Sequence, residues 1–265
     1  MVKSREARSP TIPFILGPTA SGKSAYALRL AAACNGVIVN ADSMQLYHGA
    51  PILTAQPTAA EQAAVPHRLY GYHSPLKAMS AAHWCNTALE VLKEVLAAGH
   101  TPIIVGGTGL YVQALLQGLS PIPPVPLDVR LEIDQLSCAH LYIALQQEDP
   151  MMAARLNPHD RQRLARALEV FRATGRSLAW WQQQPGVSPF PYARHITVFS
   201  PPRAALYARI NQRLEKMVAD GAVEEAMALS TLPLTASAQK ILGLREFQAV
   251  GRDELVASRR RRSVL

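Results

Sequence analysis

The sequence has few cysteines and no long apolar run, and these two features bear on which cellular compartment and which class of protein we expect. Cys34, Cys85 and Cys138 are the only cysteines among 265 residues, and none belongs to a C-x-x-C pair. This pattern indicates neither a disulfide framework nor a thiolate zinc site, and it favours a reducing cytosol. The first apolar run ends at Gly17, which makes it too short for a signal peptide or a membrane span. We therefore expect a cytoplasmic protein with no membrane partner.

Acidic residues are also scarce. Asp and Glu number 19 against 27 Lys and Arg, which gives a net charge of +8. This excess of positive charge favours a polyanionic partner. Hydrophobic residues make up 49% of the chain, which excludes a protein disordered throughout. The length suits one large α/β domain or one domain with an insertion.

Short apolar runs alternate with helix-compatible stretches in the first part of the chain. The pattern predicts strands at residues 12–16, 37–41 and 102–105, and helices at residues 24–33 and 81–98. Such alternation indicates a parallel sheet covered by helices.

The pattern changes at the proline-rich stretch PIPPVP, residues 121–126, which neither a helix nor a central strand would accept. Helical segments follow up to residue 181, and then come a strand-like run at 196–199 and an amphipathic helix at 203–229, interrupted near Gly221. We therefore expect a discontinuous α/β core domain of residues 1–120 and 195–265, with an inserted helical domain of residues 121–194.

Residues 17–24, GPTASGKS, match the phosphate-binding loop G-x-x-x-x-G-K-[ST] between an expected strand and an expected helix. Glycines let backbone N–H groups approach a phosphate chain, and the helix N-terminus adds partial positive charge. In such a loop Lys23 adds a full charge and the Ser24 hydroxyl binds Mg²⁺. The loop predicts binding of a diphosphate or triphosphate, and an ordinary glycine turn is the alternative.

Two further polar loops follow expected strands. Asp42 comes directly after VIVNA, where a carboxylate would point into the ligand crevice of a parallel sheet and serve as a general base or a metal ligand. Alternatively, Asp42 or Ser43 caps a helix. In GGTG, residues 106–109, Thr108 is the only side chain able to form a hydrogen bond. A purely structural turn is the alternative there.

Together and in this order, GPTASGKS, DSMQLY and GGTGLY closely resemble the corresponding motifs of the tRNA dimethylallyltransferases, also called tRNA isopentenyltransferases. The resemblance continues through NPHDRQRLARALEV, residues 157–170, and extends over residues 12–247. It implies a P-loop NTPase-like α/β core that transfers the dimethylallyl group from dimethylallyl diphosphate to the exocyclic amine of the adenosine 3′ of the anticodon, releasing diphosphate. The implied partners are the anticodon stem-loop of tRNA and dimethylallyl diphosphate, with Mg²⁺ as cofactor, and we expect a monomer.

The resemblance also assigns roles to residues. Asp42 would be the base that accepts the amine proton, Thr108 would align the reacting atoms, and Lys23 and Arg213 would stabilise the departing diphosphate. The diphosphate would contact Gly17, Thr19, Ala20, Ser21, Gly22, Lys23, Ser24, Arg209 and Arg213. The tRNA would contact Asp42, Ser43, Met44, Gln45, Thr108, Arg130, Gln162, Arg163, Leu164, Ala165, Arg166, Lys240 and Arg245. Without the resemblance, Arg209 and Arg213 would be assigned to a solvated helix face.

The inserted segment is rich in arginine. Six arginines lie within residues 155–176, and Leu164, Leu168 and Phe171 mark one apolar face that excludes Arg163 and Arg166. Because a loop adenosine must be extruded to reach a buried diphosphate, this helix is interpreted as a clamp on the stem-loop, and a solvated helix is the alternative. The alternative enzyme is a prenyltransferase acting on free adenine nucleotide, which shares the loops but has no need of an arginine-rich insertion. A small-molecule kinase, which shares only the phosphate-binding loop, is a further alternative, and an RNA-binding module without catalysis is the non-enzyme alternative. A further basic run occupies residues 259–262.

Overall fold

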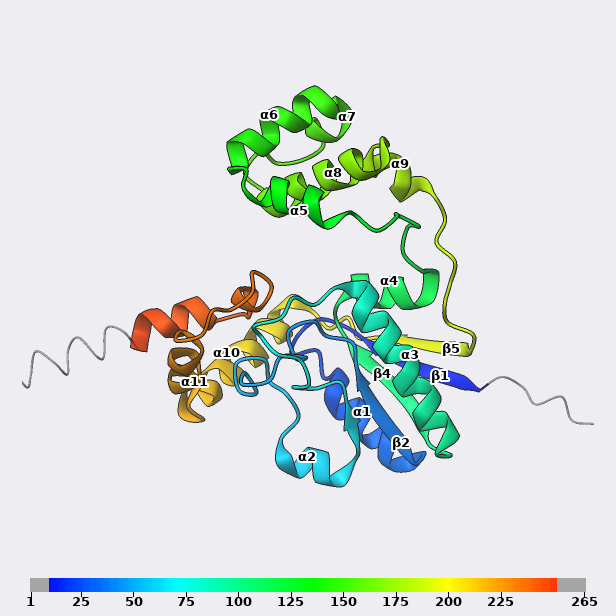
Figure 1. Cartoon of the computed structure of the whole chain (residues 1–265). Helices are drawn as coiled ribbons and strands as arrows, with labels where there is room; N and C mark the ends of the chain where they lie inside the picture. Colours follow the sequence, from blue (N-terminus) through cyan, green and yellow to red (C-terminus); the bar gives the residue numbers. More distant parts are fainter. Residues whose placement is uncertain (1–9, 252–265) are drawn as a thin grey trace, which may run out of the picture. The chain divides into compact units, whose positions relative to one another are not determined.

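A computed structural model describes residues 10–251 of the chain (Figure 1). The chain divides into two compact units. We call Met1–Leu115 with Phe190–Leu265 the core unit, and Leu116–Pro189 the helical unit. The arginine run at residues 259–262 lies outside the described residues.

The core unit is built on a five-stranded parallel sheet in the order β3-β2-β4-β1-β5. Its strands are β1 (Thr11–Leu16), β2 (Gly36–Asn40), β3 (His67–Arg68), β4 (Thr101–Gly106) and β5 (Ala193–Val198). Phe14 of β1 is in register with Ile104 of β4 and Ile196 of β5. The central strands are apolar and buried on both faces, which is typical of parallel sheets with helices on each side. The predicted parallel α/β fold is confirmed, and the two-residue strand β3 is an addition to it.

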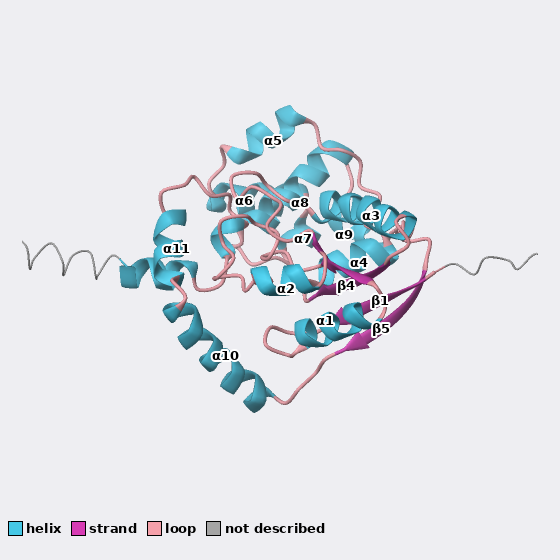
Figure 2. Ribbon diagram, turned by 90° about the horizontal axis from the view of Figure 1, so that it is seen from below, coloured by secondary structure: helices cyan, strands magenta, loops and turns pink. Residues whose placement is uncertain are grey.

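Helices cover both faces of this sheet (Figure 2). The helices of the core unit include α1 (Lys23–Ala33), α2 (Ala59–Ala64), α3 (Ala81–Ala97), α4 (Gly109–Gln117), α10 (Arg203–Ala219) and α11 (Ala222–Leu229), followed by the short 3₁₀ helix η1 (Ala238–Lys240). The helix α1 packs on one face, and α3 and α4 pack on the other, as right-handed crossovers require. Trp84, Ala88, Leu92 and Val95 are the buried face of α3, at the helical spacing that the sequence predicts. The predicted interruption near Gly221 separates α10 from α11, where Gly221 adopts a φ of 100°.

The helical unit contains α5 (Leu127–Asp134), α6 (Cys138–Glu148), α7 (Pro150–Ala153), α8 (Arg161–Thr174) and α9 (Leu178–Gln183). Its core includes Ile133, Leu141, Leu145, Leu164 and Leu168, all fully buried. Asp160 caps α8 by accepting a hydrogen bond from the N–H of Arg163 at 3.1 Å. The helices lie where the sequence predicts helical segments. Within the described residues, no helix is both long and apolar enough to cross a membrane.

The chain enters and leaves the helical unit through two segments that lie side by side. A Cβ atom on Gly118, whose φ is 79°, would lie 2.3 Å from the carbonyl oxygen of Val187. A Cβ atom on Gly186 would lie 2.8 Å from the carbonyl oxygen of Leu119. Only glycine permits this approach of two backbones. We call residues 117–119 and 186–187 the neck.

Candidate active site

The loops that follow β1, β2 and β4 meet at the carboxyl edge of the sheet. The N–H of Gly17 donates to the carbonyl of Gly106 at 3.3 Å, and the N–H of Thr108 donates to the carbonyl of Ala41 at 3.3 Å. A Cβ atom on Gly106 would lie only 2.2 Å from the carbonyl oxygen of Ala41. The loop after β4 therefore needs glycine at position 106 to approach the loop after β2.

The phosphate-binding loop passes directly into α1. Gly22 is the N-cap of α1 in a left-handed conformation, and it has no side chain to accept a hydrogen bond from the first turn. Ser21 is buried, and its Oγ has no hydrogen-bond partner among the described residues. Lys23 folds back over the loop and donates from Nζ to the carbonyl of Pro18 at 3.1 Å. An unpartnered hydroxyl and an uncapped helix N-terminus are the features that an anion satisfies.

Two cations and one carboxylate dominate the electrostatics beside this loop. Burial lowers the pKa of Lys23; Asp42 opposes this shift, and Arg213 adds to it. Burial also lowers the pKa of Arg213, and Asp42 again opposes the shift. Both side chains are thus desolvated cations that share a single carboxylate. A bound polyanion would stabilise the charged form of both.

The Asp42 side chain uses one of its two oxygens to shape its own loop. Its Oδ1 accepts a hydrogen bond from the N–H of Met44 at 3.0 Å, and its Oδ2 accepts none from the described residues. The segment continues as turns, and the next helix begins at Ala59. The helix-cap interpretation of Asp42 and Ser43 is therefore wrong. What remains is a half-buried carboxylate with one oxygen available at the carboxyl edge of the sheet.

Thr108 joins the loop after β4 to the Asp42 loop. Its Oγ1 accepts from the N–H of Ser43 at 2.9 Å and donates to the hydroxyl of Ser43 at 3.2 Å. The threonine hydroxyl thus holds the residue next to Asp42. Thr108, the one side chain of the GGTG turn that can form a hydrogen bond, therefore fixes this turn to the loop after β2.

The helix α10 places two arginines against the phosphate-binding loop. Arg209 donates from Nη1 to the carbonyls of Ala20 and Ser21 at 3.3 Å and 3.4 Å. Arg213, one turn later, is partly buried. Arg209 stays exposed while it bonds the loop, and Arg213 is partly buried and lines the same cavity as Lys23, so both side chains lie beside the loop.

A cavity of about 760 Å³ opens between the loop and α10. Residues 19–24 of the loop, Asp42 and both arginines of α10 line it on the polar side. The remaining wall is largely apolar and includes Phe199, Ile210, Leu214, Leu242 and Phe247. One cavity thus combines an anion-binding loop, a carboxylate and a hydrocarbon surface.

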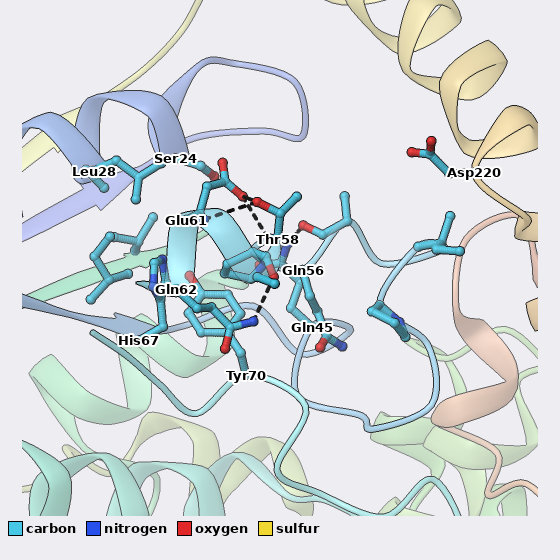
Figure 3. A pocket seen from close by; sticks show the side chains of 18 of the residues that line it. Ser24, Leu28, Gln45, Gln56, Thr58, Glu61, Gln62, His67, Tyr70 and Asp220 are labelled. Atoms are coloured by element: carbon cyan, nitrogen blue, oxygen red, sulfur yellow. Dashed lines mark hydrogen bonds between the residues drawn. The ribbon is translucent and has the colours of Figure 1, made fainter. Parts of the chain in front are cut away.

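A second cavity of about 880 Å³ lies beside α2 and was not anticipated from the sequence (Figure 3). It shares Ser24, Gln45 and Arg213 with the first cavity, so the two adjoin. Thr58 and Glu61 stand on one side of it, linked by the capping hydrogen bonds of α2 (Figure 3). Its lining comes from segments far apart in the chain, which is why no local motif indicated it.

The described residues bring together no group of three His, Cys, Asp or Glu side chains that could hold a metal ion. The Ser24 hydroxyl opens to both cavities. A Mg²⁺ ion bound by one protein hydroxyl, with substrate oxygens and waters as its other ligands, matches the preference of this ion. Ser24 and the unpartnered hydroxyl of Ser21 beside it fit a magnesium diphosphate.

The residues assigned to tRNA contact fall into both units. In the helical unit, Arg130, Gln162 and Arg163 are exposed and Arg166 is partly exposed. Leu164 and Ala165 are buried in the core of that unit, so their side chains are not available to RNA. In the core unit, Lys240 and Arg245 are exposed, whereas Ser43, Met44 and Gln45 form the partly buried loop beside Asp42.

Several arginines of the helical unit are paired with acidic residues. Arg163 lies 3.3 Å from Asp160 with a side chain that is 75% exposed. Arg172 instead bonds Glu148 at 2.6 Å, and its side chain is only 23% exposed. Exposed arginines such as Arg163 remain accessible to phosphate, whereas Arg172 serves the packing of the unit.

Two residues near the site, Glu225 and Asn40, were not predicted from the sequence. Glu225 of α11 accepts hydrogen bonds from the N–H groups of Ile52 and Leu53 at 3.0 Å and 2.8 Å, and so ties α11 to a segment beside the cavities. Asn40 lies fully buried at the end of β2 next to the Asp42 loop. A polar side chain in the apolar run VIVN was the available signal for Asn40. No local signal pointed to Glu225.

Comparison with known proteins agrees with this geometry. The family model described as IPP transferase matches residues 45–262. A tRNA dimethylallyltransferase from Rhodospirillum centenum is 49% identical over 254 residues, which cover 92% of this chain and 81% of that protein. Among solved structures, a tRNA delta(2)-isopentenylpyrophosphate transferase from Staphylococcus epidermidis matches with a TM-score of 0.61 and 31% identity over 92% of this chain and 81% of that one. A eukaryotic dimethylallyltransferase acting on tRNA matches with a TM-score of 0.67 and 25% identity over 83% of this chain and 56% of that one. The resemblance found in the sequence is confirmed, and the chain belongs to the IPP transferase family.

Proposed function

We propose that this protein transfers the dimethylallyl group of dimethylallyl diphosphate to the exocyclic amine of the adenosine 3′ of the anticodon in tRNA, releasing diphosphate. The observation that carries the proposal is a carboxylate with one available oxygen in the same cavity as a phosphate-binding loop and two desolvated cations. Membership of the IPP transferase family and the names of the relatives support the choice of donor and acceptor.

The donor binds across the cavity between the loop and α10. Its diphosphate takes the backbone N–H groups of the loop and the charge of Lys23, and it provides a partner for the hydroxyl of Ser21. Arg209 and Arg213 approach the diphosphate from α10. The five-carbon group then lies against the apolar side chains of Ile210 and Leu214, which are 38% and 49% exposed and line the cavity. Covering this hydrocarbon surface with the allylic group favours donor binding.

The acceptor nitrogen requires a base because its lone pair is delocalised into the adenine ring. The bond from this nitrogen to the first carbon of the donor forms as the carbon–oxygen bond breaks, and the bonding pair leaves with diphosphate. The amine proton passes to Oδ2 of Asp42, while Oδ1 stays bonded to the N–H of Met44. Thr108 aligns the reaction by holding Ser43, the neighbour of the base.

Charge accumulates on diphosphate as it departs. The loop N–H groups, Lys23 and Arg213 are in place before the reaction, so they stabilise this charge without reorganising. Magnesium held by the Ser24 hydroxyl and the diphosphate oxygens would add further positive charge there. Removing Mg²⁺ with a chelator is therefore expected to slow turnover.

The tRNA contacts both units. Exposed Arg130 and Arg163 of the helical unit and Lys240 and Arg245 of the core unit supply charge to the phosphate backbone. The adenine leaves its loop and lies beside Asp42 and Gln45. The amide nitrogen of Gln45 is already bonded to the carbonyls of Thr54 and Ala55 at 3.0 Å and 2.7 Å, which leaves its oxygen for the adenine amine. Every group named here belongs to one chain, and we propose that a monomer is sufficient.

The test supplies the purified protein with Mg²⁺, labelled dimethylallyl diphosphate and an anticodon stem-loop RNA. Label is expected in the RNA at the adenosine 3′ of the anticodon. A matched stem-loop with purine riboside at that position lacks the exocyclic amine and is expected to remain unlabelled. In a parallel reaction AMP is added as a competing acceptor. Transfer of the label to AMP with none to the RNA would refute the proposal, and so would transfer to neither acceptor.

A further inference from the structure

Asn40 is a buried polar residue whose hydrogen bonds converge on the proposed base. It ends β2, two residues before Asp42, and has no exposed surface. Its Oδ1 accepts from the N–H of Asp42 at 2.8 Å, and its Nδ2 donates to the carbonyl of Asp42 at 2.9 Å. One side chain therefore binds both polar groups of the Asp42 backbone.

This double contact fixes the direction of the Asp42 side chain. The N–H and the carbonyl of a residue belong to the two peptide planes on either side of its Cα atom. Because the Asn40 amide is itself planar and rigid, it holds both planes at once and so sets the direction of the Cα–Cβ bond of Asp42. The hydrogen bond from Met44 to Oδ1 then fixes the carboxylate on that bond. Oδ2 is left as the oxygen whose position the network determines.

The second hydrogen of the Asn40 amide extends the network to a strained segment. Nδ2 also donates to the carbonyl of Leu69 at 3.0 Å. Leu69 is buried and has a φ of 65°, a conformation that a bulky residue adopts only when its surroundings impose it. The chain beyond Leu69 pairs with the Asp42 loop, because the N–H of Gly71 donates to the carbonyl of Gln45 at 3.0 Å.

The backbone of Asn40 is anchored as well. Its carbonyl accepts from Nε1 of Trp84 at 3.1 Å, and the Trp84 ring is stacked on Tyr111 with centroids 4.5 Å apart. Trp84 lies on α3 and Tyr111 on α4, so two helices that follow different strands hold the residue. Both donor hydrogens and the acceptor oxygen of the Asn40 amide are satisfied, and aspartate or leucine at this position would leave carbonyls unpaired.

We propose that Asn40 is a positioning residue that holds the Asp42 carboxylate in the orientation required to accept the amine proton. This inference rests on the proposed function, since it gives Asn40 its role through the base. A purely structural asparagine would satisfy the same carbonyls and contribute to folding, but it would not act on turnover through Asp42. A double-mutant cycle distinguishes the two roles.

The cycle compares Asn40→Ser, Asp42→Asn and the double variant by single-turnover transfer of labelled donor to stem-loop RNA. Serine is small enough for water to bridge the freed carbonyls. In the wild-type background, Asn40→Ser is expected to lower the rate about a hundredfold, as for a reacting group displaced by about 1 Å. In the Asp42→Asn background, the same substitution is expected to change the rate less than about twofold, because the base it positions is absent.

Two further measurements separate positioning from loss of fold. Donor affinity measured by calorimetry is expected to stay within about twofold in Asn40→Ser, since the phosphate-binding loop is unchanged. The control is Ile103→Val in β4, a fully buried site away from the base, which lowers thermal stability but is expected to retain the wild-type rate. Each assay is run at a temperature at which circular dichroism shows the variant to be folded.

The outcomes are distinct. If the wild type modifies the RNA and Asn40→Ser lowers the rate equally in both backgrounds, Asn40 acts independently of Asp42 and the inference is wrong. An undiminished rate in Asn40→Ser alone refutes it as well. If the wild type itself transfers no label, the proposed function fails, and this is seen before any variant is compared.

Discussion

Replacing Asp42 by asparagine is expected to lower turnover by about 10²- to 10⁴-fold, the contribution typical of a general base. This corresponds to about 2.7–5.5 kcal/mol of barrier. Asparagine keeps an oxygen that can accept the N–H of Met44, so the turn seen at 3.0 Å is retained. The substitution therefore removes the base while leaving its loop in place.

Alanine at position 42 removes both features and provides the comparison. It loses the hydrogen bond to Met44, which contributes about 1 kcal/mol of stability. Asp42→Ala is thus expected to melt at a lower temperature than Asp42→Asn while showing a similar loss of turnover. A similar melting temperature for both variants would mean that the turn does not depend on the side chain of residue 42.

Donor affinity is expected not to fall in Asp42→Asn, in contrast to turnover. Burial lowers the pKa of both Lys23 and Arg213, and Asp42 opposes that lowering. The Asp42 carboxylate also repels an incoming diphosphate. Neutralising it removes that repulsion, so donor affinity is expected to be equal or higher in Asp42→Asn. Calorimetry gives the affinity, and single-turnover labelling gives the rate of transfer. A rate within about threefold of the wild type would refute the assignment of Asp42 as base.

Three further outcomes are expected. Arg163→Ala should lower the magnitude of the slope of log affinity for tRNA against log salt by about 0.9 or less, because one exposed phosphate contact is lost. An unchanged slope would exclude a clamp at this residue. The control is Arg172→Ala, which breaks the pair with Glu148 and is expected to lower stability instead. Gly106→Ala should prevent stable folding, measured by urea denaturation, because its Cβ atom would lie 2.2 Å from the carbonyl oxygen of Ala41, whereas Gly109→Ala, with nothing within 4 Å of the added atom, should fold normally. Diphosphate binding should take up protons at pH values between the lowered pKa of free Lys23 and the higher pKa of its diphosphate-bound form, because the anion stabilises the charged amine. Diphosphate affinity is then expected to strengthen as pH falls through that window. Calorimetry in two buffers of different ionisation enthalpy measures the proton uptake, and finding none would contradict this prediction.

The sheet and the three loops could be predicted because their signals are local. Apolar runs such as the one ending at Gly17 mark strands buried on both faces. The phosphate-binding loop has a spacing that follows from the backbone geometry it needs. The short strand β3 and the second cavity could not be predicted in this way, because each depends on contacts between segments distant in the chain.

In the candidate site, too, residues with a local sequence signal could be predicted and residues that depend on distant contacts could not. Lys23 could be predicted because it ends a glycine-rich loop, and Asp42 because it follows an apolar strand. The burial of Leu164 follows from its apolar spacing, yet the resemblance alone would have placed it against RNA. The bonds of Asn40 to Asp42 and Leu69 required the folded chain, because a single polar residue in an apolar strand has many possible partners.

The neck gives the helical unit the topology of a cassette. Its entry and exit backbones touch at Gly118 and Val187, so a short bridge between these points would close the remaining chain without rethreading any strand of the sheet. Insertions whose ends adjoin are tolerated because they leave the host's own contacts undisturbed. The length of the chain between the two points can therefore change without altering the path of the sheet strands, provided that the exposed arginines that contact RNA are kept.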